Sequence, residues 1–180
     1  VRYTDEDEAI DIPARLAELA AYLKEETERL GLPMPRFLME PGRSIVADAG
    51  MTLYTVGSVK RIPGYKQYAA VDGGMTDNPR YALYQSRYTV YHAYKSSSME
   101  RFDVVGRCCE SGDIIQEHVM LPASVGRGDT VAVCTTGAYN YSMASNYNRL
   151  PRPAVVMLTP DRIYEAVRRE TFADLTALDL

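Results

Sequence analysis

Two hydrophobic patterns divide the chain near residues 43–50. Ahead of this point, isoleucine and leucine recur at helical spacing across Asp11–Leu30, and charged residues such as Glu18, Lys24, Glu25 and Glu28 lie at other positions. Pro13 suits a first helical position, and Gly31 suits the residue just past the helix end. Two prolines then break the chain, and Phe37–Glu40 has the pattern of a short buried strand. A helix feeding a strand that ends in polar residues is typical of an α/β barrel, whose sites lie at the carboxyl ends of strands.

The remainder of the chain consists of short β-branched or aromatic runs separated by Gly, Pro, Asn and Asp, which predicts a β-sandwich or barrel. The predicted strands are Met51–Ile62, Tyr68–Asp72, Arg87–Tyr94, Phe102–Cys108, Asp129–Thr135 and Ala154–Thr159. Arg162–Arg168 is expected to pair with the strand before it. A short helix should follow Asn78-Pro79 to about Tyr84, and Thr171–Asp174 should cap a closing helix that ends at Leu178. The fold class is therefore mainly β.

Composition narrows the partners and the compartment. The net charge of −4 gives no reason to expect nucleic acid or an acidic membrane as a partner. Three cysteines, two of them adjacent, favour reduced thiols in a cytoplasmic protein over a disulfide framework. His92 and His118 have no suitably spaced partners, so no metal site is expected. The chain begins with Val1 rather than Met, which we interpret as a sign of truncation or processing.

Glu40-Pro41-Gly42-Arg43 is the first candidate for chemistry. A carboxylate such as Glu40 can keep the nitrogen of a pyridine-type cofactor protonated, which makes the ring a better electron acceptor. Gly42 allows close backbone approach to an anion, and Arg43 adds a fixed positive charge. The alternative is a surface turn with a local ion pair.

Cys109 and Glu110 form the second candidate. A thiol with a pKa of about 8.5 can act as a general acid, and the neighbouring carboxylate can bind an ammonium group. The alternative is a buried cysteine that packs as a small apolar residue. Cys108 alternates with Cys109 along the predicted strand and is assigned to packing, and Cys134 is assigned to the core.

Three further segments leave alternatives open. Arg80 and Tyr84 share one helical face and could bind a substrate carboxylate, although a solvated helix face is the commoner explanation. Asp72-Gly73-Gly74 is either a tight turn or a close approach to a ligand. Residues 137–142 carry glycine and hydroxyl groups that suit a phosphate or a tyrosine-rich interface.

These pieces occur together and in order in one known family. The chain closely resembles the C-terminal part of the diaminopimelate decarboxylases, pyridoxal-phosphate enzymes of the alanine-racemase-like fold, over nearly its whole length. The motifs that carry the resemblance are Glu40–Val46, Val71–Asp77, Pro79–Tyr84, Cys109–Asp113, Thr136–Tyr139, Ser142–Asn148 and Arg168–Thr171.

The resemblance implies an activity and a division of the chain. Residues 1–43 would be the C-terminal remnant of a pyridoxal-phosphate-binding α/β barrel, with its last helix and strand, and residues 44–180 a β domain. The parent enzyme would convert meso-diaminopimelate to L-lysine and CO2. Its active site would lie between the subunits of a homodimer, with the Cys109–Glu110 strand supplied by the neighbour.

The resemblance also assigns roles to residues. Cys109 would protonate the carbanion left after CO2 departs. Arg80 and Tyr84 would hold the distal carboxylate of the substrate, and Glu110 its distal ammonium. Contacts to the cofactor are implied for Glu40, Pro41, Gly42, Arg43 and Tyr139, and Arg43 and Tyr139 would also reach the substrate.

One feature departs from the family pattern. The imine-forming lysine of the family lies upstream of the matched region, and none of Lys24, Lys60, Lys66 and Lys95 falls at its position. We therefore expect the isolated chain to be inactive. Two alternatives remain open: a sister decarboxylase acting on carboxynorspermidine, ornithine or arginine, and a non-catalytic dimerisation module.

Overall fold

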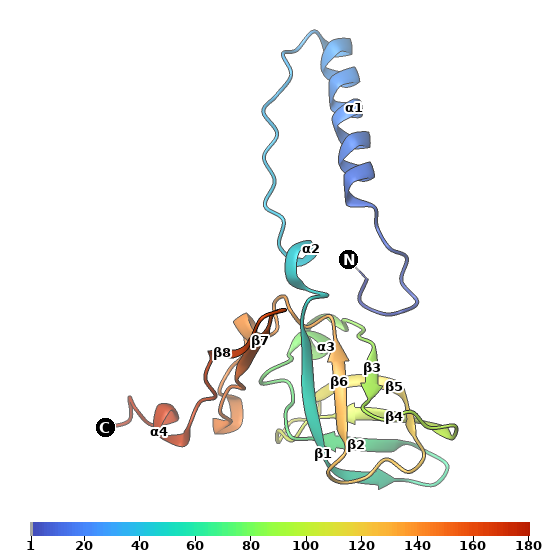
Figure 1. Ribbon diagram of the computed structural model, residues 1–180, viewed down its shortest axis with the longest axis vertical. Helices are drawn as coiled ribbons and strands as arrows, with labels where there is room; N and C mark the ends of the chain where they lie inside the picture. Colours follow the sequence, from blue (N-terminus) through green and yellow to red (C-terminus); the bar gives the residue numbers. More distant parts are fainter. Residues whose placement is uncertain (1) are drawn as a thin grey trace.

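The computed structural model describes residues 2–180; Val1, whose identity bears on the expectation of truncation, lies outside them. Three parts are visible in Figure 1: a long helix with a returning segment, a six-stranded sheet, and a hairpin followed by a short closing helix. The division into residues 1–43 and 44–180 stays a prediction.

Helix α1 (Ile12–Leu30) projects away from the sheet (Figure 1). The Asp11 carboxylate caps its start by accepting the backbone N–H of Ala14 at 3.0 Å. Gly31 ends it in the left-handed conformation, at φ 64°. The predicted helix is confirmed, but none of its residues is buried. Its apolar stripe, which includes Leu16 and Leu19, is exposed.

The segment from residue 32 to residue 42 runs back beside α1 in an extended conformation (Figure 1). The prediction of a buried strand at Phe37–Glu40 is wrong, because this stretch is exposed and pairs with no strand among residues 2–180. A strand depends on hydrogen bonds to a neighbouring strand, and no strand among residues 2–180 runs beside this one. Its apolar side chains, Phe37, Leu38 and Met39, therefore face solvent.

The six-stranded sheet confirms the mainly β fold class. Its spatial order is β3-β6-β1-β2-β4-β5, and every pairing is antiparallel except that of β2 with β4. The strands are β1 (Met51–Arg61), β2 (Gln67–Val71), β3 (Val90–His92), β4 (Met99–Val105), β5 (Ile114–Pro122) and β6 (Thr130–Cys134). Strand β5 was not among the predicted strands.

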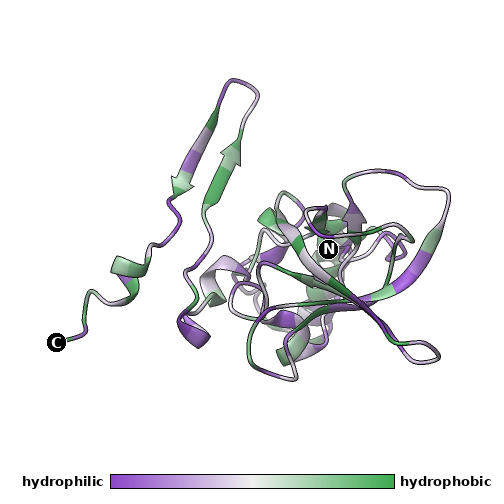
Figure 2. Cartoon of the chain, turned by 90° about the horizontal axis from the view of Figure 1, so that it is seen from below, coloured by the Kyte–Doolittle hydropathy of each residue, from purple (hydrophilic) through white to green (hydrophobic). Residues whose placement is uncertain are grey.

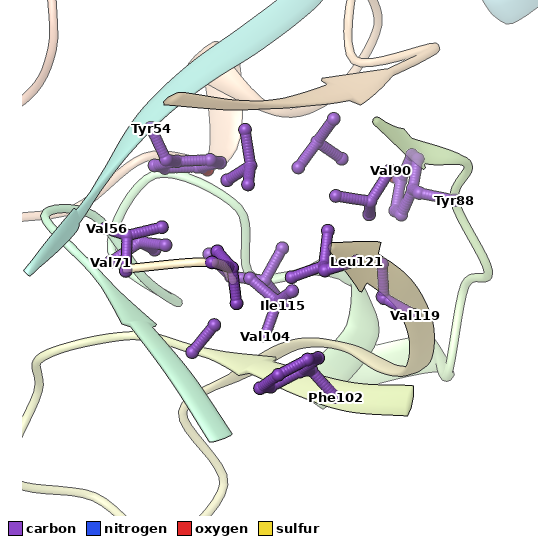
Figure 3. Close-up of a cluster of buried hydrophobic side chains, with 14 residues drawn as sticks. Tyr54, Val56, Val71, Tyr88, Val90, Phe102, Val104, Ile115, Val119 and Leu121 are labelled. Carbon is purple, nitrogen blue, oxygen red and sulfur yellow. The ribbon is translucent and has the colours of Figure 1, made fainter. Parts of the chain in front are cut away.

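Strand β1 joins the two halves of the sheet. Its first half pairs with β6 and its second with β2, and the register shifts at a bulge between Val56 and Ser58. The edge strands β3 and β5 approach each other, so the sheet is nearly closed into a barrel. Inside it lie the fully buried side chains of Val56, Val104 and Ile115, among others (Figure 3).

Alternation along β6 overturns the assignment of Cys134 to the core. Val131 and Val133 are fully buried, whereas Cys134 is only half-buried. Successive side chains of a strand point to opposite faces, so Cys134 lies on the face away from the barrel interior.

The hairpin of β7 (Val155–Leu158) and β8 (Ile163–Val167) confirms the pairing expected after residue 159. Figure 2 shows it standing clear of the sheet. The closing helix α4 (Phe172–Leu175) begins with the predicted cap: Thr171 and Asp174 form a reciprocal capping box. The helix is shorter than expected, ending at Leu175.

Candidate functional site

The short helices α2 (Arg43–Val46) and α3 (Arg80–Tyr84) bring two arginines to one tyrosine. The Cζ atoms of Arg43 and Arg80 lie 5.4 Å and 5.8 Å from the ring centroid of Tyr139. Arg80 also lies over the Tyr84 ring, at 5.0 Å. We call Gly42, Arg43, Arg80, Tyr84 and Tyr139 the arginine–tyrosine cluster.

Local packing explains why the cluster forms. Strand β1 pairs with β6, so the loop after β6 lies against the loop before β1. The N–H of Gly137 donates to Ala47 O at 2.9 Å, and the N–H of Thr136 donates to Gly50 O at 3.0 Å. A Cβ atom at position 42 would lie 2.2 Å from the Tyr139 hydroxyl, so a side chain there would displace the Tyr139 ring from its present place.

Arg80 is the most unusual member of the cluster. It is only 7% exposed, yet its guanidinium forms no ion pair with any carboxylate of residues 2–180. Its contacts are weak: Ser86 Oγ lies 3.5 Å away and Met143 Sδ 3.9 Å away, while Nε has no partner. Burying a cation without a counter-charge is costly, so the arrangement favours an anion from elsewhere.

Further polar groups without partners in the described chain lie in the same region. Asn78 and Asn140 are buried with both side-chain amide atoms unbonded, as is the Tyr88 hydroxyl. Burial raises the pKa of Tyr88, and the positive charges of Arg80 and Arg43 act in the opposite direction. The charges of both arginines therefore act on the Tyr88 hydroxyl.

Cys109 and Glu110 lie on a turn between β4 and β5 rather than on a strand. We call residues 106–113 the cysteine turn. The buried Asp113 carboxylate holds it, accepting the N–H of Cys108 and the N–H of Met75, each at 2.6 Å. These bonds bend the chain after Val105, which is why the expected alternation of Cys108 and Cys109 along a strand is wrong.

The two candidate side chains of the cysteine turn, Cys109 and Glu110, are exposed to solvent. Cys109 is exposed, and its N–H donates to Asn148 Oδ1 at 2.6 Å. Glu110 is exposed and accepts only local bonds, from the Gly112 N–H at 3.1 Å and the Ser111 hydroxyl at 3.3 Å. Cys108 is half-buried, and burial beside Asp113 raises the pKa of its thiol to about 11.

The glycines after β2 serve packing. A Cβ atom on Gly73 would lie 2.2 Å from the Tyr54 ring, and one on Gly74 would lie 2.6 Å from the Asp113 carboxylate. The close approach that Asp72-Gly73-Gly74 suggested is therefore made to the protein's own side chains.

The predicted site residues thus fall into three groups. Gly42, Arg43, Arg80, Tyr84 and Tyr139 are brought together. Cys109 and Glu110 sit on the cysteine turn and form no hydrogen bond, ion pair or cation–π contact with the cluster among residues 2–180. Glu40 and Pro41 are exposed at the end of the extended segment.

Sequence reasoning missed two residues that organise these groups. Asp113 closes the Cys109–Asp113 motif but received no role, although a carboxylate after a Ser-Gly pair signals a turn-stabilising acceptor. Tyr3 contacts Arg43, with the Arg43 Cζ 4.8 Å from its ring centroid. No local pattern could have revealed that contact, because the two residues are far apart in sequence.

A metal centre and a membrane span have no support in the described part of the chain. No group of three or more metal-binding side chains occurs in residues 2–180. None of the helices there combines the length and apolarity that a membrane span requires.

Comparison with known proteins places the chain. Residues 10–137 match the model of the C-terminal sheet domain of pyridoxal-dependent decarboxylases. The chain belongs to this family.

Individual relatives narrow the resemblance. The chain is 47% identical to a diaminopimelate decarboxylase of Bacillus subtilis (strain 168) over its full length, and 40% identical to one of Staphylococcus aureus (strain COL) over 99% of it. It spans 41% and 43% of the lengths of these two relatives. The crystal structure of diaminopimelate decarboxylase from M. jannaschii in complex with L-lysine matches 97% of the chain, with 32% identity and a TM-score of 0.88, and 40% of that protein is covered.

A sister enzyme is less similar. Lysine/ornithine decarboxylase from Vibrio vulnificus, crystallised with cadaverine, matches 75% of this chain and 36% of its own, with 26% identity and a TM-score of 0.63.

The family implies pyridoxal phosphate, and the cluster fits part of that cofactor's needs. Arg43 forms no ion pair with a carboxylate of residues 2–180, and Gly42 packs without a side chain against Tyr139. These groups suit a phosphate. No lysine contacts the cluster: Lys66 is bound to Asp103 and Glu117, at 2.7 Å and 2.9 Å, and Lys24, Lys60 and Lys95 are exposed elsewhere.

Proposed function

We propose that this chain is the carboxyl-terminal portion of a decarboxylase that converts meso-diaminopimelate to L-lysine and CO2. The observation that carries the proposal is the buried guanidinium of Arg80, which has no carboxylate partner among residues 2–180. The names and identities of the relatives support the choice of reaction.

Arg80 and Tyr84 would bind the distal carboxylate of the substrate. A carboxylate can satisfy a guanidinium through two parallel charge-assisted hydrogen bonds. Tyr84 is exposed beside Arg80 and offers a hydroxyl to the same group. A substrate with a carboxylate at its far end would therefore remove the cost of burying Arg80 unpaired.

Five residues would hold pyridoxal phosphate: Glu40, Pro41, Gly42, Arg43 and Tyr139. When bound, this cofactor supplies an electron sink for the pair left behind by the departing carboxylate. Arg43 and the backbone at Gly42 would neutralise the phosphate, and Glu40 would keep a proton on the ring nitrogen. Arg43 and Tyr139 would also reach the substrate.

Cys109 and Glu110 would act on the site of a second copy in a cytoplasmic homodimer. Cys109 would deliver a proton to the substrate carbon after CO2 leaves, and Glu110 would hold the distal ammonium. Two observations support an origin in the partner subunit: both side chains are exposed, and neither forms a hydrogen bond or ion pair with the cluster among residues 2–180. The positive cluster and the acidic turn would then grip the two charges of one substrate end.

A chimaera tests the reaction. This chain is joined to the preceding part of the Bacillus subtilis relative, and CO2 release is measured with meso-diaminopimelate, ornithine, arginine and carboxynorspermidine. We expect decarboxylation of meso-diaminopimelate above the others, and no turnover by the unjoined chain with added pyridoxal phosphate. Preference for a substrate without a distal carboxylate would refute the assignment of Arg80.

Mixing two impaired variants, assayed at a substrate concentration far below the KM of the Arg80→Ala variant, tests the shared site. A chimaera with Cys109→Ala and one with Arg80→Ala are unfolded together and refolded. Mixed dimers should regain activity, because one of their two sites then combines an intact cluster with an intact turn. Refolded mixtures no faster than the two parents at this substrate concentration would argue for a site made within one chain.

A further inference from the structure

Tyr3 is fixed against the cluster by the folding of the segment around it. Its N–H and that of Thr4 each donate to the Asp7 carboxylate at 2.9 Å, which closes a tight turn. The N–H of Thr89 donates to Tyr3 O at 3.4 Å, and the N–H of Asp5 donates to the Thr89 hydroxyl at 3.0 Å. The backbone of Tyr3 is thereby tied to the chain just ahead of β3.

The ring of Tyr3 has a second support. It packs edge-to-face against Tyr88, with ring centroids 5.5 Å apart and an interplanar angle of 69°. Tyr88 is itself buried in the hydrophobic core. The orientation of the Tyr3 ring is therefore set by its contact with the buried ring of Tyr88.

On this ring lies the guanidinium of Arg43, whose Cζ is 4.8 Å from the Tyr3 centroid and 5.4 Å from that of Tyr139. These contacts are to ring faces, and no hydrogen bond among residues 2–180 uses an N–H of the Arg43 side chain, so these donors remain available to an anion. No carboxylate of residues 2–180 forms an ion pair with Arg43.

We propose that Tyr3 is a positioning residue that, together with Tyr139, fixes the guanidinium of Arg43 so that its N–H edge is presented to a phosphate. The inference rests on the proposed function, in which Arg43 binds the cofactor phosphate. The role belongs to the aromatic ring and not to the hydroxyl, so phenylalanine should replace Tyr3 without loss and an aliphatic residue should not.

Nuclear magnetic resonance of the labelled chain reads the contact directly. Two ring faces should shift the Arg43 side-chain signals upfield of those of exposed arginines, and nuclear Overhauser contacts should join Arg43 Hδ to the Tyr3 ring. Tyr3→Leu should remove a large part of the shift, and Tyr3→Phe should keep it. Absence of both signals in the unmodified chain overturns the proposal, whatever the variants do. Tyr3→Met replaces Tyr3→Leu if the latter does not fold.

Titration with inorganic phosphate reads the consequence. The unmodified chain and Tyr3→Phe should bind alike, while Tyr3→Leu should bind about threefold to thirtyfold more weakly, as loss of a cation–π contact implies. Equal phosphate affinity in Tyr3→Leu and the unmodified chain overturns the positioning role and leaves the proposed function standing. An Arg43 signal that depends on Tyr3, in a chain that binds no phosphate, supports the positioning role and counts against the proposed task of Arg43.

Discussion

The arginine–tyrosine cluster and the cysteine turn differ in how their charges are balanced. In the cluster, Arg80 is buried and no carboxylate of the described residues answers its charge. In the cysteine turn, the buried carboxylate of Asp113 is answered by two backbone N–H groups, and the functional groups of Cys109 and Glu110 are exposed. Within residues 2–180 the cluster thus has an unpaired buried charge, whereas the turn has a paired buried charge and exposed functional groups.

This difference separates residues suited to binding an anion from residues whose functional groups are exposed on a turn. A buried, unpaired cation is energetically unfavourable, so the folded cluster favours the binding of an anion. The cysteine turn has no such deficit, because its buried polar groups are satisfied locally. In the proposed homodimer, the turn would present Cys109 and Glu110 to the partner subunit.

The largest expected effect concerns the acid. Cys109→Ala in the chimaera should lower kcat by about 10²–10⁴-fold and change KM little, because a general acid acts in the transition state. Steady-state CO2 release measures both constants. Cys108→Ala, on the same turn but half-buried, is the matched control and should retain most of the activity. An unchanged kcat for Cys109→Ala would remove the turn from the chemistry.

For the arginine–tyrosine cluster, the expected change is in KM and not in kcat. Arg80→Ala in the chimaera should raise KM for meso-diaminopimelate by an amount equivalent to about 2–5 kcal/mol, because the substrate carboxylate loses its buried partner. Arg87→Ala removes an exposed arginine three residues beyond α3 and should leave KM unchanged. If both substitutions had the same effect, Arg80 would be acting through general electrostatics and not through a direct contact.

Much of the sheet could be predicted from the sequence, because each strand carries its own alternating pattern. Strand β5 was missed because its alternation is interrupted: His118 adopts a left-handed backbone conformation, at φ 60°, within the run from Ile114 to Pro122. The segment Phe37–Glu40 failed for the opposite reason. Its apolar pattern is that of a buried strand, but pairing depends on a neighbour that no local pattern can supply.

The candidate site was predictable as residue types and not as a geometry. The sequence motifs indicated Arg43, Arg80 and Cys109 as candidate site residues, because each motif lies within one short segment of the chain. Their grouping follows from the pairing of β1 with β6 and from the turn held by Asp113, which are long-range features. Tyr3 was out of reach for the same reason, as it meets Arg43 only in the folded chain.

Asp113 is the point at which the cysteine turn can be broken without touching the cluster. Asp113→Ala should destabilise the chain by about 2–4 kcal/mol, because the N–H groups of Cys108 and Met75 lose a buried charged acceptor. Urea denaturation gives the difference, and hydrogen exchange should localise it to residues 106–113. Asp113→Asn retains one acceptor oxygen and should cost less. Asp161→Ala, at an exposed carboxylate in the β7–β8 hairpin, is the control. A much smaller loss of stability, with no change in hydrogen exchange at residues 106–113, would mean that Asp113 does not support the turn.

The smallest effect concerns how the cluster is anchored. The Tyr81 hydroxyl, on the same short helix as Arg80, donates to Glu117 of β5 at 2.6 Å. Burial and the Glu117 charge raise the pKa of Tyr81 from 10.0 to about 12, so the stabilisation it brings is complete below pH 10 and is lost as the pH rises toward 12. The pKa of Glu117 is lowered by Tyr81 and Lys66, so its contribution is present above pH 4.5 and is lost as the pH falls below that value.

Tyr81→Phe should therefore lower the free energy of unfolding by about 1 kcal/mol at pH 7, and the deficit relative to the unmodified chain should shrink as the pH rises above 10. Urea denaturation at several pH values measures this difference, and Tyr65→Phe, at an exposed tyrosine, should show none. In the chimaera, Tyr81→Phe should raise KM slightly and leave kcat unchanged, because only the helix that carries Arg80 is loosened. A fall in kcat alone would instead link this helix to the proton-transfer step and erase the distinction between the two regions.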